Sequence, residues 1–132
     1  MAPSINHDPI DRFLTELSAG DGISPELYTA DAQLDATVPN WRFAQAGASA
    51  VAAQFSHWYD APTVIESVHL RPISGGAIVE LDLSWIEDGV AYAAHHVHLI
   101  TVADGRISAD TVFCGGRWSA TLLAEMEEAR AQ

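Results

Sequence analysis

The stretch AIVELDLSWIEDGVAYAAHHVHLITVADGRISADTVFC, residues 77–114, decides the fold because it reads as three extended runs joined by two Asp-Gly turns. The runs cover 77–87, 90–103 and 106–114, and apolar and polar side chains alternate along much of the first. A fourth run, 63–73, precedes them across a Ser-Gly-Gly turn. Such short links join antiparallel neighbours, since a parallel return needs a long crossover. The stretch therefore predicts a four-stranded antiparallel meander.

Helical patterns precede and follow this meander. Pro9 suits a first helical position, and the apolar residues after it recur at helical spacing: Ile10, Phe13, Leu14 and Leu17. The other expected elements are a short helix from Ser24-Pro25, a short strand over 32–38, a third helix from near Gly47 and a closing helix from Ser119. We therefore expect a single α+β domain over residues 1–132, with the helices packed on one face of the sheet.

Composition excludes several classes of protein. The 132 residues are 48% apolar and 18% charged, which is typical of a globular domain. Eighteen acidic residues against six arginines and no lysine give a formal net charge of −12, so we expect no binding to nucleic acids or membranes. The single cysteine, Cys114, cannot form an internal disulfide, and the N-terminus has neither the basic nor the apolar region of a signal peptide. These features predict a cytoplasmic protein.

Three of the six histidines lie in the middle run, and the first turn determines which way each points. A two-residue hairpin at Asp88-Gly89 pairs Leu81 with His96. Because Leu81 belongs to the apolar face of its strand, His96 and His98 are expected on the inner face, while His95 points outward.

The second turn determines the partner of His98. Residues 103–105, Ala-Asp-Gly, read as a three-residue type I turn with a glycine bulge. In this register His98 lies directly opposite Asp110, with the two Cβ atoms about 5 Å apart. A two-residue turn would instead pair Leu99 with Asp110 and separate the two polar groups.

The polar residues of the predicted inner face suggest proton-transfer chemistry. His98 and Asp110 suit general acid–base catalysis, because a carboxylate can fix the tautomer of an imidazole; the alternative is a structural hydrogen bond between two buried groups. His96 lines the same pocket or joins His98 as a ligand of iron or zinc, although this weak motif leads us to expect no metal site. Asp35 acts as a further acid or base with Arg42 as its polarising partner, or lies on an exposed polar face.

Aromatic side chains would form the walls of such a pocket. The expected ligand-binding residues are His96, Tyr28, Trp41, Arg42, Trp58, Tyr92 and Val112. Cys114 has no adjacent base in the sequence to activate it, so we expect an inert buried thiol.

The order of elements and several short motifs resemble those of the nuclear transport factor 2-like (NTF2-like) superfamily, which includes SnoaL-like cyclases and ketosteroid isomerases. The motifs are Ala19-Gly20-Asp21, Leu27-Tyr28-Thr29-Ala30-Asp31-Ala32, Gly47 and Val102-Ala103-Asp104-Gly105-Arg106-Ile107. The resemblance spans nearly the whole chain. It implies a curved sheet wrapped around helices to form a cone, a pocket at the open end and a homodimer.

The catalytic residues of the superfamily transfer only in part. Ketosteroid isomerases carry an oxyanion-hole tyrosine where this chain has Phe13, and a catalytic aspartate where it has Ala36, so that activity is not expected. SnoaL-like cyclases place acid–base residues on the final strands, where Asp110 lies.

We therefore expect a small enzyme that acts without a cofactor on an apolar, lightly oxygenated organic molecule. The expected reactions are isomerisation, cyclisation, dehydration and hydration. The alternative is a non-catalytic ligand-binding or dimerisation module on the same scaffold. The homodimer is expected to form through the outer sheet face, which carries apolar and uncharged residues: Val97, Leu99, Thr101 and Ile107.

Overall fold

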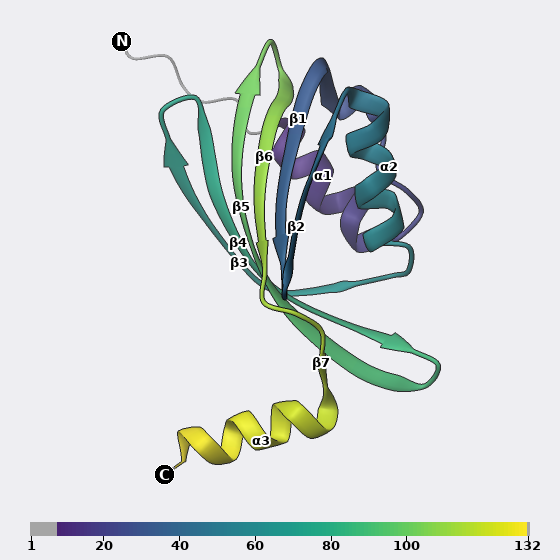
Figure 1. Ribbon diagram of the computed structural model, residues 1–132, viewed down its shortest axis with the longest axis vertical. Helices are drawn as coiled ribbons and strands as arrows, with labels where there is room; N and C mark the ends of the chain where they lie inside the picture. Colours follow the sequence, from purple (N-terminus) through teal and green to yellow (C-terminus); the bar gives the residue numbers. More distant parts are fainter. Residues whose placement is uncertain (1–7, 132) are drawn as a thin grey trace.

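The computed structural model describes residues 8–131, so the signal-peptide expectation concerns residues outside the described part of the chain. The elements follow in the order α1 (Asp8–Ala19), η1 (Pro25–Leu27), β1 (Tyr28–Val38), β2 (Trp41–Ala46), α2 (Ala48–Trp58), β3 (Val64–Ile73), β4 (Gly76–Glu87), β5 (Val90–Ala103), β6 (Arg106–Cys114), β7 (Trp118–Ser119) and α3 (Ala120–Arg130). The strands form one curved sheet with the order β2-β1-β6-β5-β4-β3, and β7 pairs with β5 (Figure 1). The expected α+β architecture is confirmed.

Helices α1 and α2 cover one face of this sheet (Figure 1). The predicted apolar face of α1 is buried through Ile10, Phe13 and Leu17. Burying this stripe stabilises the helix more than its intrinsic propensity does, since a helix of 12 residues is marginal alone. The short second helix is a single 3-10 turn, and α3 buries none of its residues and extends beyond the lower end of the sheet (Figure 1).

The sheet contains two features that the sequence pattern did not predict. The hairpin strand β2 follows β1 across a turn in which Asn40 adopts a φ of 63°. In addition, β1 begins at Tyr28 and runs parallel to β6, so the sheet is mixed. The long connection through α2 and the meander permits this parallel contact between the first and sixth strands.

The hairpin β4–β5 has the predicted register, with Leu81 opposite His96. The hairpin β5–β6 does not, because Asp104 and Gly105 form a two-residue turn, with φ of 53° and 74°, between the paired residues Ala103 and Arg106.

The bulge in this second hairpin lies at Ser108 instead of Gly105. Val102 pairs with Ile107 and Thr101 with Ala109, so Ser108 is the extra residue. The added residue reverses the direction of the following side chains, so Asp110 returns to the inner face. Asp110 then lies opposite Ile100, and not opposite His98 as predicted.

This shift also corrects one residue of the predicted dimer face. Ile107 is fully buried, because it precedes the bulge and shares the inner face with Asp110. Val97 is half-buried while Leu99 and Thr101 are exposed on the opposite face. The homodimer through this face stays a prediction.

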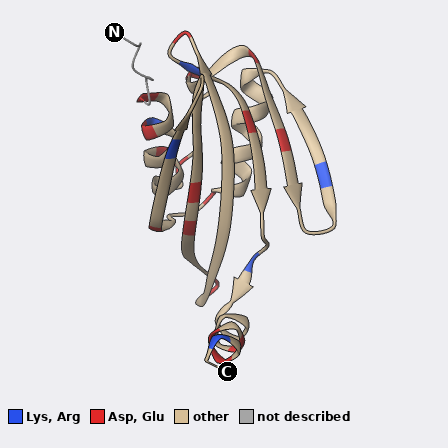
Figure 2. Cartoon of the chain, turned by 90° about the vertical axis from the view of Figure 1, so that its left-hand side faces the viewer, with Lys and Arg blue, Asp and Glu red and all other residues tan. Residues whose placement is uncertain are grey.

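The core lies between the two covering helices and the inner face of the sheet. Its largest buried side chains include Phe13, Tyr28, Phe55, Leu34 and Leu81. None of the helices within residues 8–131 is long and apolar enough to cross a membrane. Acidic residues are spread over the helices and strands (Figure 2).

Candidate functional site

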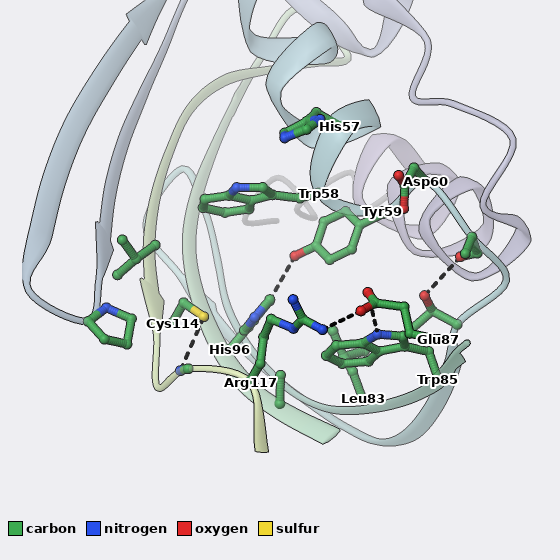
Figure 3. Close-up of a pocket in the computed structure, with 16 residues that line it drawn as sticks. His57, Trp58, Tyr59, Asp60, Leu83, Trp85, Glu87, His96, Cys114 and Arg117 are labelled. Atoms are coloured by element: carbon green, nitrogen blue, oxygen red, sulfur yellow. Dashed lines mark hydrogen bonds and ion pairs between the residues drawn. The ribbon is translucent and has the colours of Figure 1, made fainter. Parts of the chain in front are cut away.

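A cavity of about 570 Å³ opens at one end of the sheet, within the size range of small-molecule sites (Figure 3). The end of α2, strands β4 and β5, and the connection from β6 to β7 supply most of its lining: Val38, Pro39, His57, Trp58, Tyr59, Asp60, Ala61, Thr63, Leu83, Trp85, Glu87, Ala94, His96, Cys114, Gly116 and Arg117. Trp58 and Trp85 give it two large aromatic wall residues. The cavity is therefore apolar in its walls, with a small number of polar groups among them.

A hydrogen-bonded tyrosine and histidine form the polar floor of the cavity. The Tyr59 hydroxyl and the Nδ1 atom of His96 lie 2.8 Å apart, and the two residues are only 4% and 7% exposed (Figure 3). Tyr59 follows the last residue of α2, and His96 projects from the inner face of β5. Burial lowers the pKa of His96 to about 3, with smaller contributions from His98 and His95, so its imidazole is neutral at pH 7.

The hydrogen-bonding needs of this pair select one tautomer of His96. Burial raises the pKa of Tyr59 well above its usual range, so the hydroxyl keeps its proton. Within the described residues this hydroxyl has no partner besides His96. If Nδ1 carried the proton and donated it, the buried tyrosine proton would have no acceptor. Tyr59 therefore donates to Nδ1, and the Nε2–H of His96 is left as a donor on the cavity lining.

A second polar group closes one side of the cavity mouth. The Arg117 guanidinium donates to the Glu87 carboxylate, and its carbon lies 4.6 Å above the centre of the Tyr92 ring. The Trp85 indole also donates to Glu87, over 3.3 Å, and stacks on Tyr92 with ring centres 6.1 Å apart. Four side chains thus hold one another beside the opening. Figure 3 shows three of them, Arg117, Glu87 and Trp85.

Cys114 lies in the lining, and is half-buried instead of fully buried as expected. Its Sγ accepts a hydrogen bond of 3.3 Å from the backbone N–H of Gly116. Burial raises the pKa of the thiol, which disfavours the reactive thiolate. This agrees with an unreactive side chain.

The predicted His98–Asp110 pair exists, although its register differs from the prediction. His98 Nδ1 lies 2.9 and 3.1 Å from the two carboxylate oxygens of Asp110. The side chains are 0% and 1% exposed, and neither residue is part of the cavity lining. The rings of Phe13 and Phe55 lie 5.5 and 5.9 Å from His98, and His96 lies 6.2 Å away on the cavity side. The pair is therefore enclosed directly behind the cavity floor.

Two polar atoms in this part of the core are buried without a hydrogen-bond partner among the described residues. One is the second ring nitrogen of His98, Nε2, and the other is the Tyr28 hydroxyl. Burial and the nearby Asp110 raise the pKa of Tyr28. Tyr28 stacks against Phe55 in the core and does not line the cavity.

The other sequence-predicted residues divide between the cavity and distant positions. Trp58 and His96 line it, and Tyr92 lies behind its rim. Val112 is buried in the core opposite His98. Trp41 is 70% exposed beside the turn between β1 and β2.

Asp35 and Arg42 also lie away from the cavity. They form an ion pair of 2.6 Å on the exposed side of the β1–β2 hairpin, and the bond from Arg42 lowers the pKa of Asp35. The structure thus realises the exposed alternative for Asp35, since it shares the polar face of Gln33 and Thr37.

Sequence reasoning missed most of the polar lining, namely Tyr59, His57, Asp60, Glu87 and Arg117. Tyr59 lies four residues after the buried Phe55, a spacing that signals the same helical face. Arg117 follows a Gly-Gly pair, and no local pattern predicts that this connection returns to the cavity. In residues 8–131 no group of three or more His, Cys, Asp or Glu side chains could hold a metal ion.

Comparisons with known proteins relate the chain to others through its fold alone. No family model and no curated protein sequence matches it. Among solved structures, an NTF2-like protein from Anabaena variabilis matches with a TM-score of 0.70 and 14% identity, over 83% of this chain and 85% of that one. An NTF2-like protein of unknown function from Mesorhizobium loti matches with a TM-score of 0.67 and 22% identity, over 87% and 98%.

A third structure is that of SalBIII, described as an epoxide hydrolase/cyclase-like enzyme in pyran ring formation. It matches with a TM-score of 0.67 and 17% identity, over 83% of this chain and 90% of that one. These comparisons agree with the predicted resemblance, and the chain has the NTF2-like fold.

Proposed function

We propose that the chain binds a small, mostly apolar organic molecule with one oxygen function and acts on it by acid–base chemistry of its own side chains. The observation that carries this proposal is the aromatic-walled cavity with the buried Tyr59–His96 pair at its floor. A cavity of this kind favours an apolar body, and the polar pair provides a point of orientation.

His96 is the residue that would touch the reacting atoms. Its Nε2–H can donate a hydrogen bond to a carbonyl, epoxide or hydroxyl oxygen of the ligand. Because the site is largely desolvated, such a bond stabilises negative charge that develops on that oxygen more strongly than water does. This polarisation would assist isomerisation, cyclisation, dehydration or hydration, and the description of SalBIII as epoxide hydrolase/cyclase-like supports cyclisation and hydration among these.

His98 and Asp110 would then be positioning residues. They lie behind His96 and do not reach the cavity, so direct proton transfer to a ligand would require the floor to open. Their hydrogen bond fixes the imidazole of His98 against the ring of His96. Such support holds a ligand-contacting group in one geometry.

The enclosure of the pair also favours a second candidate function, a non-catalytic ligand-binding module. In that case the His98–Asp110 bond only satisfies two buried polar groups.

One experiment separates the two functions. Acetophenone offers an aromatic body and a carbonyl oxygen. When its carbonyl is polarised, a buffer base removes a methyl proton to give the enol, and the enol takes up a deuteron from deuterium oxide as it returns to the ketone. Binding is followed by NMR shifts of His96, Trp58 and Trp85, and exchange by loss of the methyl proton signal. We expect the protein to bind the ketone and to accelerate exchange by about a hundredfold over buffer.

Variants assign the effect to the cavity floor. His96→Leu and Tyr59→Phe should each reduce the acceleration at least about tenfold, since both disrupt the oriented donor. His95→Gln is the matched control, because the neighbouring histidine faces the outer side of the sheet. Binding without faster exchange would support the module. No binding at all would refute the proposed function.

A further inference from the structure

The cavity mouth carries one carboxylate that no neighbouring cation balances. Its lining contains two acids, Asp60 and Glu87, and one arginine, Arg117. Glu87 is paired with Arg117, whereas exposed Asp60 makes no hydrogen bond or ion pair within the described residues. Asp60 directly follows Tyr59, is exposed, and belongs to the same lining as the Glu87–Arg117 pair, which Figure 3 shows with it. Leaving histidines aside, the lining therefore has a net charge of −1.

Arg117 is poorly suited to receive an anionic ligand. Its guanidinium is already paired with the Glu87 carboxylate, and one face of it lies over the Tyr92 ring. An incoming carboxylate would have to compete with Glu87 and would approach a second acid at Asp60. Like-charge approach of this kind opposes binding.

The aromatic walls favour the opposite charge. Trp58 and Trp85 both line the cavity, and tryptophan has the most favourable ring for contact with an organic cation. The net charge of −12 adds a long-range field that attracts cations and repels anions.

We propose that the ligand carries a protonated amine, which lies at the mouth between Asp60 and the tryptophan walls while its oxygen function reaches His96. This inference rests on the proposed function and adds the charge of the substrate class. A protonated amine can donate to a carboxylate and also lie against an indole face, so both features of the mouth would contact the same group.

Three probes of similar size test the inference: 2-phenylethylamine, 2-phenylethanol and 3-phenylpropionate. They share the aromatic body and differ in charge. Dissociation constants are measured by NMR titration at low salt and about pH 8, which is above the usual pKa of a histidine and below that of an alkyl amine. We expect the amine to bind at least about tenfold more tightly than the carboxylate, with the alcohol between them, and the difference to shrink in about 0.5 M salt.

Two variants identify the residues responsible. Asp60→Asn should reduce the preference for the amine over the alcohol at least about threefold, whereas Asp31→Asn, which removes an equal charge on β1 outside the cavity lining, should change it less than about twofold. Glu87→Gln should release Arg117 and improve binding of the carboxylate.

The outcomes separate this inference from the function on which it rests. If the alcohol binds and the amine shows no advantage, or if Asp60→Asn leaves the preference intact, the inference is overturned while the cavity function stands. If none of the three probes shifts the cavity residues, the proposed function fails with it.

Discussion

Replacing Asp110 by leucine tests whether the enclosed histidine–carboxylate pair is a coupled unit of the core. The change removes both oxygens that lie within 3.1 Å of His98 Nδ1 and provides no new acceptor at a position that is 1% exposed. Breaking a buried pair by removing one partner costs about 3 to 5 kcal/mol of unfolding free energy. A domain of this size is stable by only about 5 to 15 kcal/mol, so the melting temperature should fall by roughly 10 to 20 °C.

Two companion variants divide this cost between charge and burial. Asp110→Asn keeps one oxygen acceptor and should lose only about 1 to 2 kcal/mol, the difference between a charged and a neutral hydrogen bond. The double variant His98→Leu, Asp110→Leu removes both polar partners, so it should be more stable than Asp110→Leu alone.

The assay is equilibrium unfolding in urea at neutral pH, with the slope of each transition compared between variants. A loss below about 1 kcal/mol for Asp110→Leu would refute the reasoning, because a desolvated donor cannot lose its acceptor so cheaply. The cycle is completed by His98→Leu alone. A double variant whose loss equals the sum of the losses of His98→Leu and Asp110→Leu would refute the coupling between the two side chains.

Three more predictions concern the cavity and its surroundings. Since burial lowers the pKa of His96 from its ordinary value of 6.5 to about 3, the unfolded chain binds a proton there in mildly acidic solution that the native protein does not. The unfolding free energy of the wild type should therefore fall relative to that of His96→Leu as the pH drops below about 6.5, by about 2 kcal/mol at pH ~5. Urea unfolding at each pH measures this difference, and a difference that does not change with pH would contradict the lowered pKa. Cys114 should react with N-ethylmaleimide at least about tenfold more slowly in the native protein than in the unfolded chain, as followed by mass spectrometry. Bound acetophenone should slow the reaction further, because the thiol lines the cavity, and an unchanged rate with the ligand would place the thiol outside it. Asp35→Asn and Arg42→Gln should leave acetophenone affinity unchanged in NMR titrations, because the pair is exposed and outside the cavity, and a measurable loss would make Asp35 a pocket group.

The meander could be predicted from sequence because local chemistry determines its hairpins. Asp88-Gly89 and Asp104-Gly105 both adopt positive φ, the conformation that two-residue hairpins require. The alternation of residues 77–87 then assigns the inner face of β4, and the paired register carries that assignment to His96 and His98. These are short-range relations, which a single sequence retains.

The position of the bulge could not be predicted, because Asp-Gly is compatible with both a two-residue and a three-residue turn. Ser108 carries none of the glycine signal that marks many bulges, and its hydroxyl instead lies 2.8 Å from that of Thr101. The prediction nevertheless placed His98 and Asp110 on one face. A bulge at Gly105 and a bulge at Ser108 each insert one unpaired residue before Asp110, so both turn the Asp110 side chain to the same side of the sheet.

The cavity itself depends on contacts between distant segments. Tyr59 meets His96 across 37 residues, and Arg117 meets Glu87 across 30. No periodicity or turn signal relates these positions. The parallel contact of β1 with β6 is of the same kind, so the sequence predicted the surroundings of the site better than its polar lining.

The bulge at Ser108 has a consequence for how this interior could change over evolutionary time. A regular strand turns residues two apart toward the same side, whereas here Ile107 and Asp110, three apart, both face inward. Deletion of one residue would turn either the isoleucine or the carboxylate out to solvent without altering any side chain. The chemistry behind the cavity floor therefore depends on the number of residues in β6 as well as on their identity. A relative could lose the inward acid through a one-codon deletion, or gain it through a one-codon insertion, as readily as through a substitution.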